Sequence, residues 1–139
     1  MEKIYKECIN LSKKSIKNND IPVGAIIVKD GIIISKGFNT REKDDNILGH
    51  AEINAILEAT KNMNNWNLDG CDMYVTLKPC SMCMEIIKQS RIRDVYYLLD
   101  KPSSKKEFSK TKLREITEIN YKEEYLAILQ NFFKKLREK

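Results

Sequence analysis

Apolar residues recur every three or four positions along several segments of the chain, a spacing that is typical of amphipathic helices. In the first such segment, residues 2–18, Ile4, Cys8 and Leu11 fall on one face while lysines and glutamates fall between them. The same spacing predicts three more helices. They run from His50 to the asparagine-rich stretch 62–67, from Cys80 to Gln89 and from Tyr121 to Arg137.

Short apolar runs predict the strands of a sheet. These runs cover residues 21–29, 32–35, 72–77 and 94–99, and alternation of apolar and polar residues over 113–119 predicts a fifth strand. Asp30-Gly31 separates the first two runs, and this dipeptide favours a two-residue hairpin turn. Residues 38–49 and 101–112 are polar and show no periodicity, so we expect loops there.

Helices that alternate with strands indicate an α/β fold, which we predict to be a three-layer α/β/α sandwich. The hairpin near the start makes the predicted five-stranded sheet mixed rather than purely parallel. A chain of 139 residues suits one domain with one core. We therefore predict a single domain over residues 1–139, in which residues 101–139 form a basic C-terminal loop and helix.

The net charge of +5 is distributed unevenly along the chain. Residues 1–100 hold 14 Lys or Arg against 14 Asp or Glu, whereas residues 101–139 hold 11 against 6. Such an excess favours an anionic partner, most often nucleic acid. Because 20 of the 25 basic residues are lysines, a lysine-rich proteome explains the same count, and both interpretations stay open here.

The composition argues against several classes of protein. The longest apolar runs are far shorter than the roughly 20 residues of a membrane-spanning helix. The first residues include acidic side chains and lack the apolar core of a secretory signal, so we expect a cytoplasmic protein without a membrane partner. Four cysteines are too few for a disulfide scaffold, and in a reducing compartment a close cysteine pair indicates a metal or redox site.

The residues that carry chemistry lie at the starts of two predicted helices. His50 is the only histidine, and Cys80 and Cys83 are three residues apart. Cysteines at this spacing share one face of a helix and can bind one metal ion. The partial positive charge of a helix N-terminus lowers a thiol pKa and favours the thiolate that zinc requires. Together these residues predict a zinc site with two cysteines and one histidine.

Glu52 follows His50 by two residues, so it can stand beside the metal without binding it. Three protein ligands leave the fourth position of tetrahedral zinc to a water, which is typical of catalytic sites. Zinc lowers the pKa of that water from about 15.7 to about 7. Glu52 is therefore a candidate for moving protons between the water, a substrate nitrogen and a leaving group.

The pattern His-x-Glu followed by Pro-Cys-x-x-Cys is a known signature of zinc-dependent nucleobase deaminases. Further segments point to one branch of this superfamily. They are Ile21–Ala25, Gly37–Asn39, Tyr74–Cys83, Ser90–Ile92 and Phe132–Arg137. On these motifs the sequence resembles the bacterial tRNA adenosine deaminase family, which converts the wobble adenosine of an anticodon to inosine.

The resemblance implies a cytidine-deaminase-like fold, one zinc ion per chain and a tRNA anticodon arm as the partner. It implies His50, Cys80 and Cys83 as zinc ligands, Glu52 as the proton shuttle and Asn39 as a hydrogen-bonding contact to the target base. It further implies a homodimer whose RNA site draws on both subunits, and a final helix that contacts RNA. The segment after the fourth predicted strand, residues 100–107, is shorter than the glycine-containing segment usual in the family. Recognition of a different RNA or of a smaller substrate therefore stays an alternative.

Two other functions stay open at this point. One is deamination of a free nucleobase or nucleoside, such as cytosine, cytidine or guanine. The other is a zinc-containing RNA-binding module without catalysis, against which Glu52 argues because a structural zinc site needs no proton shuttle. A redox role for the Cys80 and Cys83 pair would leave His50 and Glu52 unexplained. The remaining cysteines, Cys8 and Cys71, are expected to be small buried apolar residues.

Overall fold

The computed structural model describes residues 2–100, 112, 114, 115, 117 and 119–138. The elements in chain order are α1 (Glu2–Ile16), β1 (Gly24–Lys29), β2 (Ile32–Phe38), α2 (Ala51–Met63), β3 (Cys71–Leu77), α3 (Ser81–Gln89), β4 (Asp94–Leu99) and α4 (Ile119–Arg137). The chain divides into two compact units, residues 1–103 and residues 104–139. The first unit holds every element from α1 to β4, and the second holds α4. The assignment of all 139 residues to one domain stays a prediction.

Four strands form one mixed sheet in the order β2-β1-β3-β4. β1 pairs antiparallel with β2 and β3, and β3 pairs parallel with β4. The predicted hairpin is confirmed: Asp30 and Gly31 have φ angles of 51° and 77°, and the tight turn between twisted strands needs positive φ at both central positions. β2 and β4 are therefore the two edge strands of the sheet.

The prediction of five strands is corrected to four within the described residues. The expected strand over 113–119 lies partly outside those residues, whereas Arg114, Glu115 and Thr117 are described and belong to no strand. Ile119 already begins α4. A short alternating pattern also fits extended chain that leads into a helix, so the pattern alone does not identify a strand partner.

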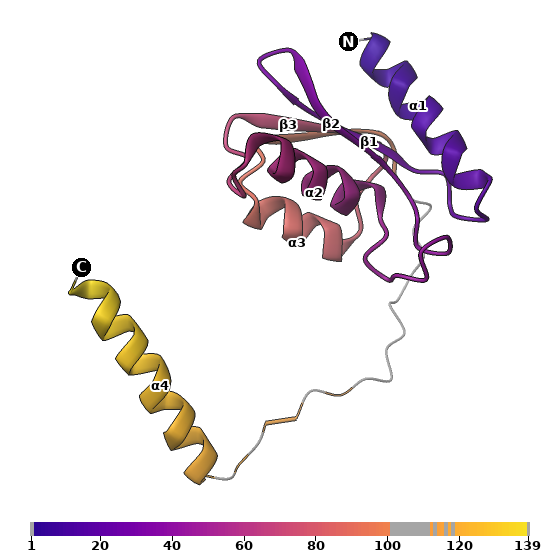
Figure 1. Ribbon diagram of the computed structural model, residues 1–139. Helices are drawn as coiled ribbons and strands as arrows, with labels where there is room; N and C mark the ends of the chain where they lie inside the picture. Colours follow the sequence, from indigo (N-terminus) through magenta and orange to yellow (C-terminus); the bar gives the residue numbers. More distant parts are fainter. Residues whose placement is uncertain (1, 101–111, 113, 116, 118, 139) are drawn as a thin grey trace. The chain divides into compact units, whose positions relative to one another are not determined.

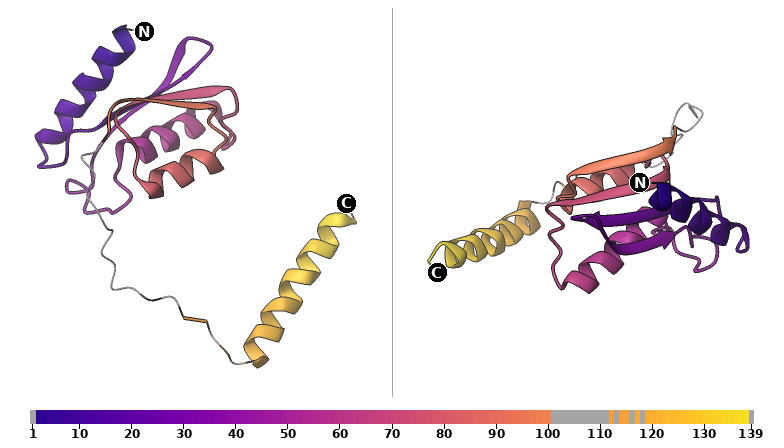
Figure 2. Two further views of the ribbon diagram at one scale, coloured as in Figure 1. Left: turned by 180° about the vertical axis from the view of Figure 1, so that it is seen from behind. Right: turned by 90° about the horizontal axis from the view of Figure 1, so that it is seen from above.

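The sheet lies between two helical layers, as Figures 1 and 2 show for α1 on one face and α2 with α3 on the other. Alternate residues of β1 build the two cores, because successive side chains of a strand point to opposite faces. Ala25 and Ile27 pack in the core beneath α2 and α3, whereas Ile26 and Val28 pack in the core beneath α1. The expected three-layer α/β arrangement is thus present in residues 1–103.

Two glycines let helices approach the sheet closely on opposite faces. A Cβ atom on Gly37 would overlap the carbonyl oxygen of Ala51 and lie 2.7 Å from the backbone nitrogen of Ala55, both in α2. A Cβ atom on Gly24 would overlap the carbonyl oxygen of Cys8 in α1. The Gly37 contact fixes the start of α2, and with it the position of the residue that precedes this helix.

The second unit contains an amphipathic helix with a basic end. α4 begins two residues before the predicted start, and none of its described side chains is buried. Phe132 and Phe133 form an edge-to-face pair with ring centroids 5.4 Å apart, and Lys134, Lys135 and Arg137 follow in the last turn. Among the described residues, no helix is both long and apolar enough to cross a membrane.

The two glycines give a matched test of how helix packing supports the zinc site. Gly37→Ala and Gly24→Ala should each lower the free energy of unfolding by about 1–3 kcal/mol, because an added methyl group overpacks a tight contact. Only Gly37→Ala should also weaken zinc binding, since α2 begins directly after His50. Urea unfolding and competition with a chelator measure the two effects. Equal loss of zinc affinity in both variants would contradict the special role of Gly37.

Candidate metal centre

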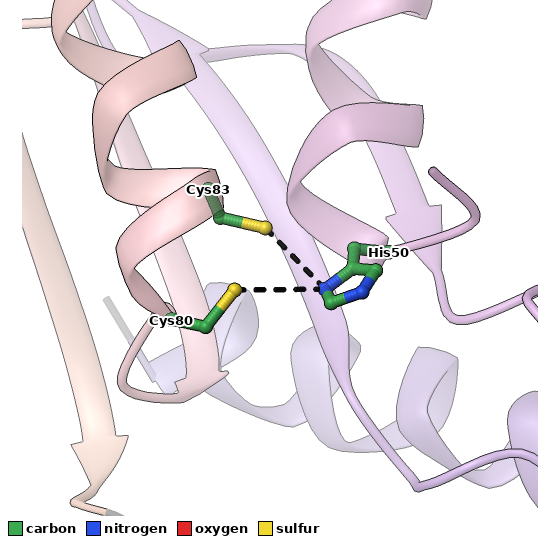
Figure 3. Close-up of side chains that lie close together, drawn as sticks. All are labelled: His50, Cys80 and Cys83. Atoms are coloured by element: carbon green, nitrogen blue, oxygen red, sulfur yellow. Dashed lines mark hydrogen bonds between the residues drawn. The ribbon is translucent and has the colours of Figure 1, made fainter. Parts of the chain in front are cut away.

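Three candidate ligands converge at the starts of α2 and α3. His50 precedes α2 in extended conformation, Cys80 precedes α3, and Cys83 lies in the first turn of α3. The Nδ1 atom of His50 is 3.4 Å from the Cys83 Sγ and 3.9 Å from the Cys80 Sγ. All three side chains point toward one another in Figure 3, and their ligand atoms lie within 4.8 Å of each other.

This donor set fits a zinc ion. Typical zinc–sulfur and zinc–nitrogen bonds of about 2.3 and 2.05 Å at tetrahedral angles place a nitrogen and a sulfur ligand about 3.6 Å apart. The two nitrogen–sulfur distances here bracket that value. Two thiols and one imidazole also match the softness that zinc prefers. The predicted His50–Cys80–Cys83 cluster is therefore present and fits a zinc ion.

The charge balance at Cys83 differs from the expectation based on the helix N-terminus. Burial raises the pKa of the Cys83 thiol well above its usual range, and the nearby Glu52 and Cys80 raise it further. Burial and negative neighbours both disfavour a thiolate at this position. A divalent cation reverses this preference, because its charge stabilises a coordinated thiolate.

Glu52 lies at the zinc centre and not at the surface. It is in the first turn of α2 and is 4% exposed. Its carboxylate and the Cys83 thiol are hydrogen-bonded. Glu52 also lines the same cavity as His50 and Cys80, so the structure brings together the four residues of the two sequence motifs.

A small cavity of about 70 Å³ opens beside these residues. A second cavity of about 90 Å³ adjoins it and shares Ile21, Asn39 and His50 with it. The lining of the first cavity is Ile21, Val23, Asn39, His50, Glu52, Leu77, Lys78 and Cys80. Apolar walls with a few polar groups are typical of small-ligand sites. A larger groove of about 300 Å³ lies beside Tyr5 and Tyr74 and has no zinc ligand in its lining.

Asn39 lines the cavity as its candidate role requires, and it has a structural role that sequence reasoning missed. Its Oδ1 atom accepts a hydrogen bond from the Ala51 backbone nitrogen at 2.7 Å. Its Nδ2 atom donates to the Ile21 carbonyl oxygen at 3.0 Å. Asn39 thus satisfies an N–H group at the start of α2, beside His50. An asparagine amide has two N–H donors, so one remains beyond the bond to Ile21.

The loop 39–49 has a further support that the sequence did not reveal. Asp20 is buried, and its carboxylate accepts hydrogen bonds from the backbone nitrogens of Glu42 and Lys43 at 2.9 and 3.4 Å. The loop makes one helical turn there, since the Asp44 nitrogen donates to the Thr40 carbonyl. Asp20 therefore acts as an N-terminal cap for a turn in a distant loop. From the neighbouring sequence alone, Asp20 suggests only the end of the preceding helix.

The family model described as the cytidine and deoxycytidylate deaminase zinc-binding region matches residues 1–99. The tRNA-specific adenosine deaminase of Aquifex aeolicus (strain VF5) is 39% identical over 145 residues, which cover 98% of this chain and 95% of that protein. The protein of the same name in Bacillus subtilis (strain 168) is 32% identical over 147 residues, with coverage of 99% and 91%. The counterpart in Rickettsia bellii (strain RML369-C) is 35% identical over 146 residues, with coverage of 96% and 99%.

Solved structures show the same relationship. A structure from work on A-to-I editing by tRNA:A34 deaminases at the wobble position of transfer RNA has a TM-score of 0.72 and 31% identity, covering 74% of this chain and 75% of that one. The guanine deaminase from Bacillus subtilis has a TM-score of 0.78 and 25% identity, covering 93% of each chain. These similarities confirm the predicted cytidine-deaminase-like fold.

Removal of one thiol tests the zinc centre. Loss of a residue that only hydrogen-bonds a metal ligand typically weakens metal binding by about 10- to 100-fold. Cys80→Ser and Cys83→Ala should each weaken zinc binding by more than this, because each removes a direct ligand. Cys71→Ala is the matched control, since Cys71 is also buried but lies outside the cluster. Elemental analysis after dialysis against a weak chelator measures the effect. Full zinc content in Cys83→Ala would rule out this ligand set.

Proposed function

This chain belongs to the tRNA-specific adenosine deaminase family of the cytidine and deoxycytidylate deaminase superfamily, and on that premise we propose how its residues convert the wobble adenosine of a tRNA to inosine. The reaction replaces the C6 amino group of adenine with oxygen and releases ammonia. The single observation that carries the assignment of roles is the convergence of His50, Cys80 and Cys83 beside the buried Glu52.

Zinc, when bound by these three ligands, supplies a water whose pKa of about 7 makes it a nucleophile at neutral pH. Glu52 would accept a proton from the water that adds to C6 and would pass it to the ring nitrogen beside C6. Glu52 would then move the proton of the new C6 hydroxyl to the amino group, so that the C–N bond breaks, the C6 carbonyl forms and ammonia leaves. Glu52 is buried and lines the cavity, so its carboxylate would lie beside a base that occupies the cavity.

Asn39 holds the target base in this scheme. The N–H group that remains after its bond to Ile21 donates to an acceptor on the purine ring. Ile21, Val23 and Leu77 provide apolar walls that exclude water from the base. A base must leave its stack to reach such a cavity, and this costs little in a single-stranded anticodon loop.

Three further properties follow from the family resemblance and stay proposals. The chain forms a homodimer whose RNA site uses both subunits. It acts in the cytoplasm, where tRNA is the substrate and a reducing environment keeps the zinc-binding thiols free. The basic end of α4 contacts the RNA, because Lys134, Lys135 and Arg137 cluster in its last turn.

Deamination of a free base is the second candidate function. The observation that favours it is the near-complete structural overlap with a guanine deaminase. Three tRNA-specific relatives align over nearly the whole chain at 32–39% identity, against 25% for the guanine deaminase, and they favour the tRNA substrate.

The role of Glu52 is tested by a matched pair of substitutions on one helix. Glu52→Ala should keep one zinc ion per chain but lower kcat for inosine formation by about 100- to 10,000-fold, because general acid–base catalysis is lost. Glu58→Ala should leave turnover unchanged, since Glu58 is exposed on the same helix. An anticodon stem-loop with adenosine at the wobble position is the substrate, with inosine and ammonia as the readouts.

The same assay separates the functions. Wild-type protein is offered the stem-loop and, in parallel, adenosine, cytidine, cytosine and guanine. Turnover of a free base without inosine in the RNA would overturn the tRNA assignment, and zinc-loaded protein silent on every substrate would indicate the non-catalytic module.

The basic end of α4 gives a separate prediction. Replacement of Lys134, Lys135 and Arg137 by glutamine should raise KM for the stem-loop and weaken its salt dependence, because fewer counterions are released when RNA binds. Zinc content and the far-ultraviolet circular dichroism spectrum serve as controls for the metal centre and folding. An unchanged KM over a range of salt concentrations would show that these charges are solvated surface only.

A further inference from the structure

A cationic side chain lies in the wall of the zinc cavity, at a position that the zinc motif does not explain. Lys78 lines this cavity together with His50, Glu52 and Cys80. Its backbone is fixed, because its nitrogen donates a hydrogen bond of 2.8 Å to the carbonyl oxygen of Leu99 in β4. Lys78 is also only two residues from Cys80, so the chain holds the backbone of this lysine close to the zinc centre.

The ammonium group of Lys78 has two weak contacts within the protein. Its Nζ atom is 3.8 Å from an Asp100 carboxylate oxygen and 5.8 Å from the centroid of the Tyr97 ring. The side chains of Lys78 and Asp100 are 49% and 62% exposed. Such exposed pairs contribute little to stability, so a stronger anion can replace Asp100 at small cost. Tyr97 can keep its cation–π contact with the ammonium while the carboxylate partner is replaced.

We propose that Lys78 binds a backbone phosphate next to the target adenosine and that Asp100 forms an ion pair with the Lys78 ammonium group when no RNA is bound. This inference rests on the proposed function. A nucleotide inserted into the zinc cavity carries phosphodiesters on both sides of its ribose, and these charged groups stay at the cavity rim. Lys78 lines the cavity and its side chain is exposed, so its ammonium can reach a phosphate there, and lysine binds phosphate as a point charge.

The consequence concerns the choice between RNA and a free base. A free nucleobase or nucleoside has no phosphate, so it gains nothing from Lys78 and leaves the contact with Asp100 in place. A phosphodiester gains one ionic contact at the reaction site itself. Lys78 therefore favours a polynucleotide over its isolated base, independently of contacts made elsewhere on the RNA.

The chain offers a matched control in Lys36. This lysine is 46% exposed and forms an ion pair of 3.3 Å with Glu7, so its surroundings resemble those of Lys78. It lies in β2 and pairs with a residue of α1, and it is absent from the linings of both cavities at the zinc centre. A general effect of one lost surface charge would therefore appear equally in both lysines.

The experiment measures binding separately from turnover. Binding of a fluorescent anticodon stem-loop is measured by anisotropy at about 50–300 mM salt. All proteins carry Glu52→Ala, so that the target adenosine is not converted to inosine during the titration. Adding Lys78→Met should weaken binding about three- to tenfold at the lowest salt, and the slope of log K against log salt should become shallower by about 0.7 to 1. Lys36→Met should change neither quantity.

Two further variants sharpen the result. Asp100→Asn should tighten RNA binding, because it removes the internal competitor for Lys78. Lys78→Arg should retain the salt slope, since it keeps the charge, and its zinc content controls for folding. An unchanged slope in Lys78→Met, or an equal change in Lys36→Met, would overturn the inference.

The outcome is distinct from that of the proposed function. If the salt dependence of RNA binding depends on Lys78 but the wild-type protein forms no inosine, the proposed catalytic function is wrong and the phosphate contact is supported. Inosine formation with a slope independent of Lys78 would do the reverse.

Discussion

The burial of potential metal ligands beside a buried carboxyl group is the constraint on which the site in the first unit depends. Glu52 and Cys83 are both buried, and they lie against Cys80 and His50. Burial raises the pKa of the Cys83 thiol, and a divalent cation would reverse this preference by stabilising the thiolate. The starts of α2 and α3 and the close packing of Gly37 against α2 hold the ligands where one divalent ion satisfies them.

Much of this arrangement is predictable from local sequence patterns. Apolar spacing locates the helices and strands of the described residues to within a few residues, because each has an apolar stripe or run. The hairpin follows from Asp30 and Gly31, whose conformation is a property of the dipeptide. The zinc ligands are predictable because their spacing places them on helix starts. The expected fifth strand over 113–119 shows the limit, since strand pairing depends on a partner that alternation does not specify.

The remaining features depend on contacts between residues far apart in the chain. Asp20 caps a turn more than twenty positions later, and Asn39 satisfies the start of α2. Neither contact produces a periodic pattern of apolar and polar residues from which it could be predicted. Charge counting likewise assigns the basic excess to residues 101–139, whereas Lys78 lies in the charge-balanced part and reaches the cavity only through the fold. The total charge of a segment therefore says little about the potential at the reaction site.

The presence of one histidine has a practical consequence. Every imidazole signal in a nuclear magnetic resonance spectrum of this chain arises from His50, so no resonance assignment is needed to observe it. The Nδ1 atom of this ring faces both thiols, and its nitrogen shift will differ between the free, protonated and coordinated states. In a nitrogen-15-labelled sample, the single imidazole ring therefore reports on the zinc centre alone. Its state can be followed while RNA is added.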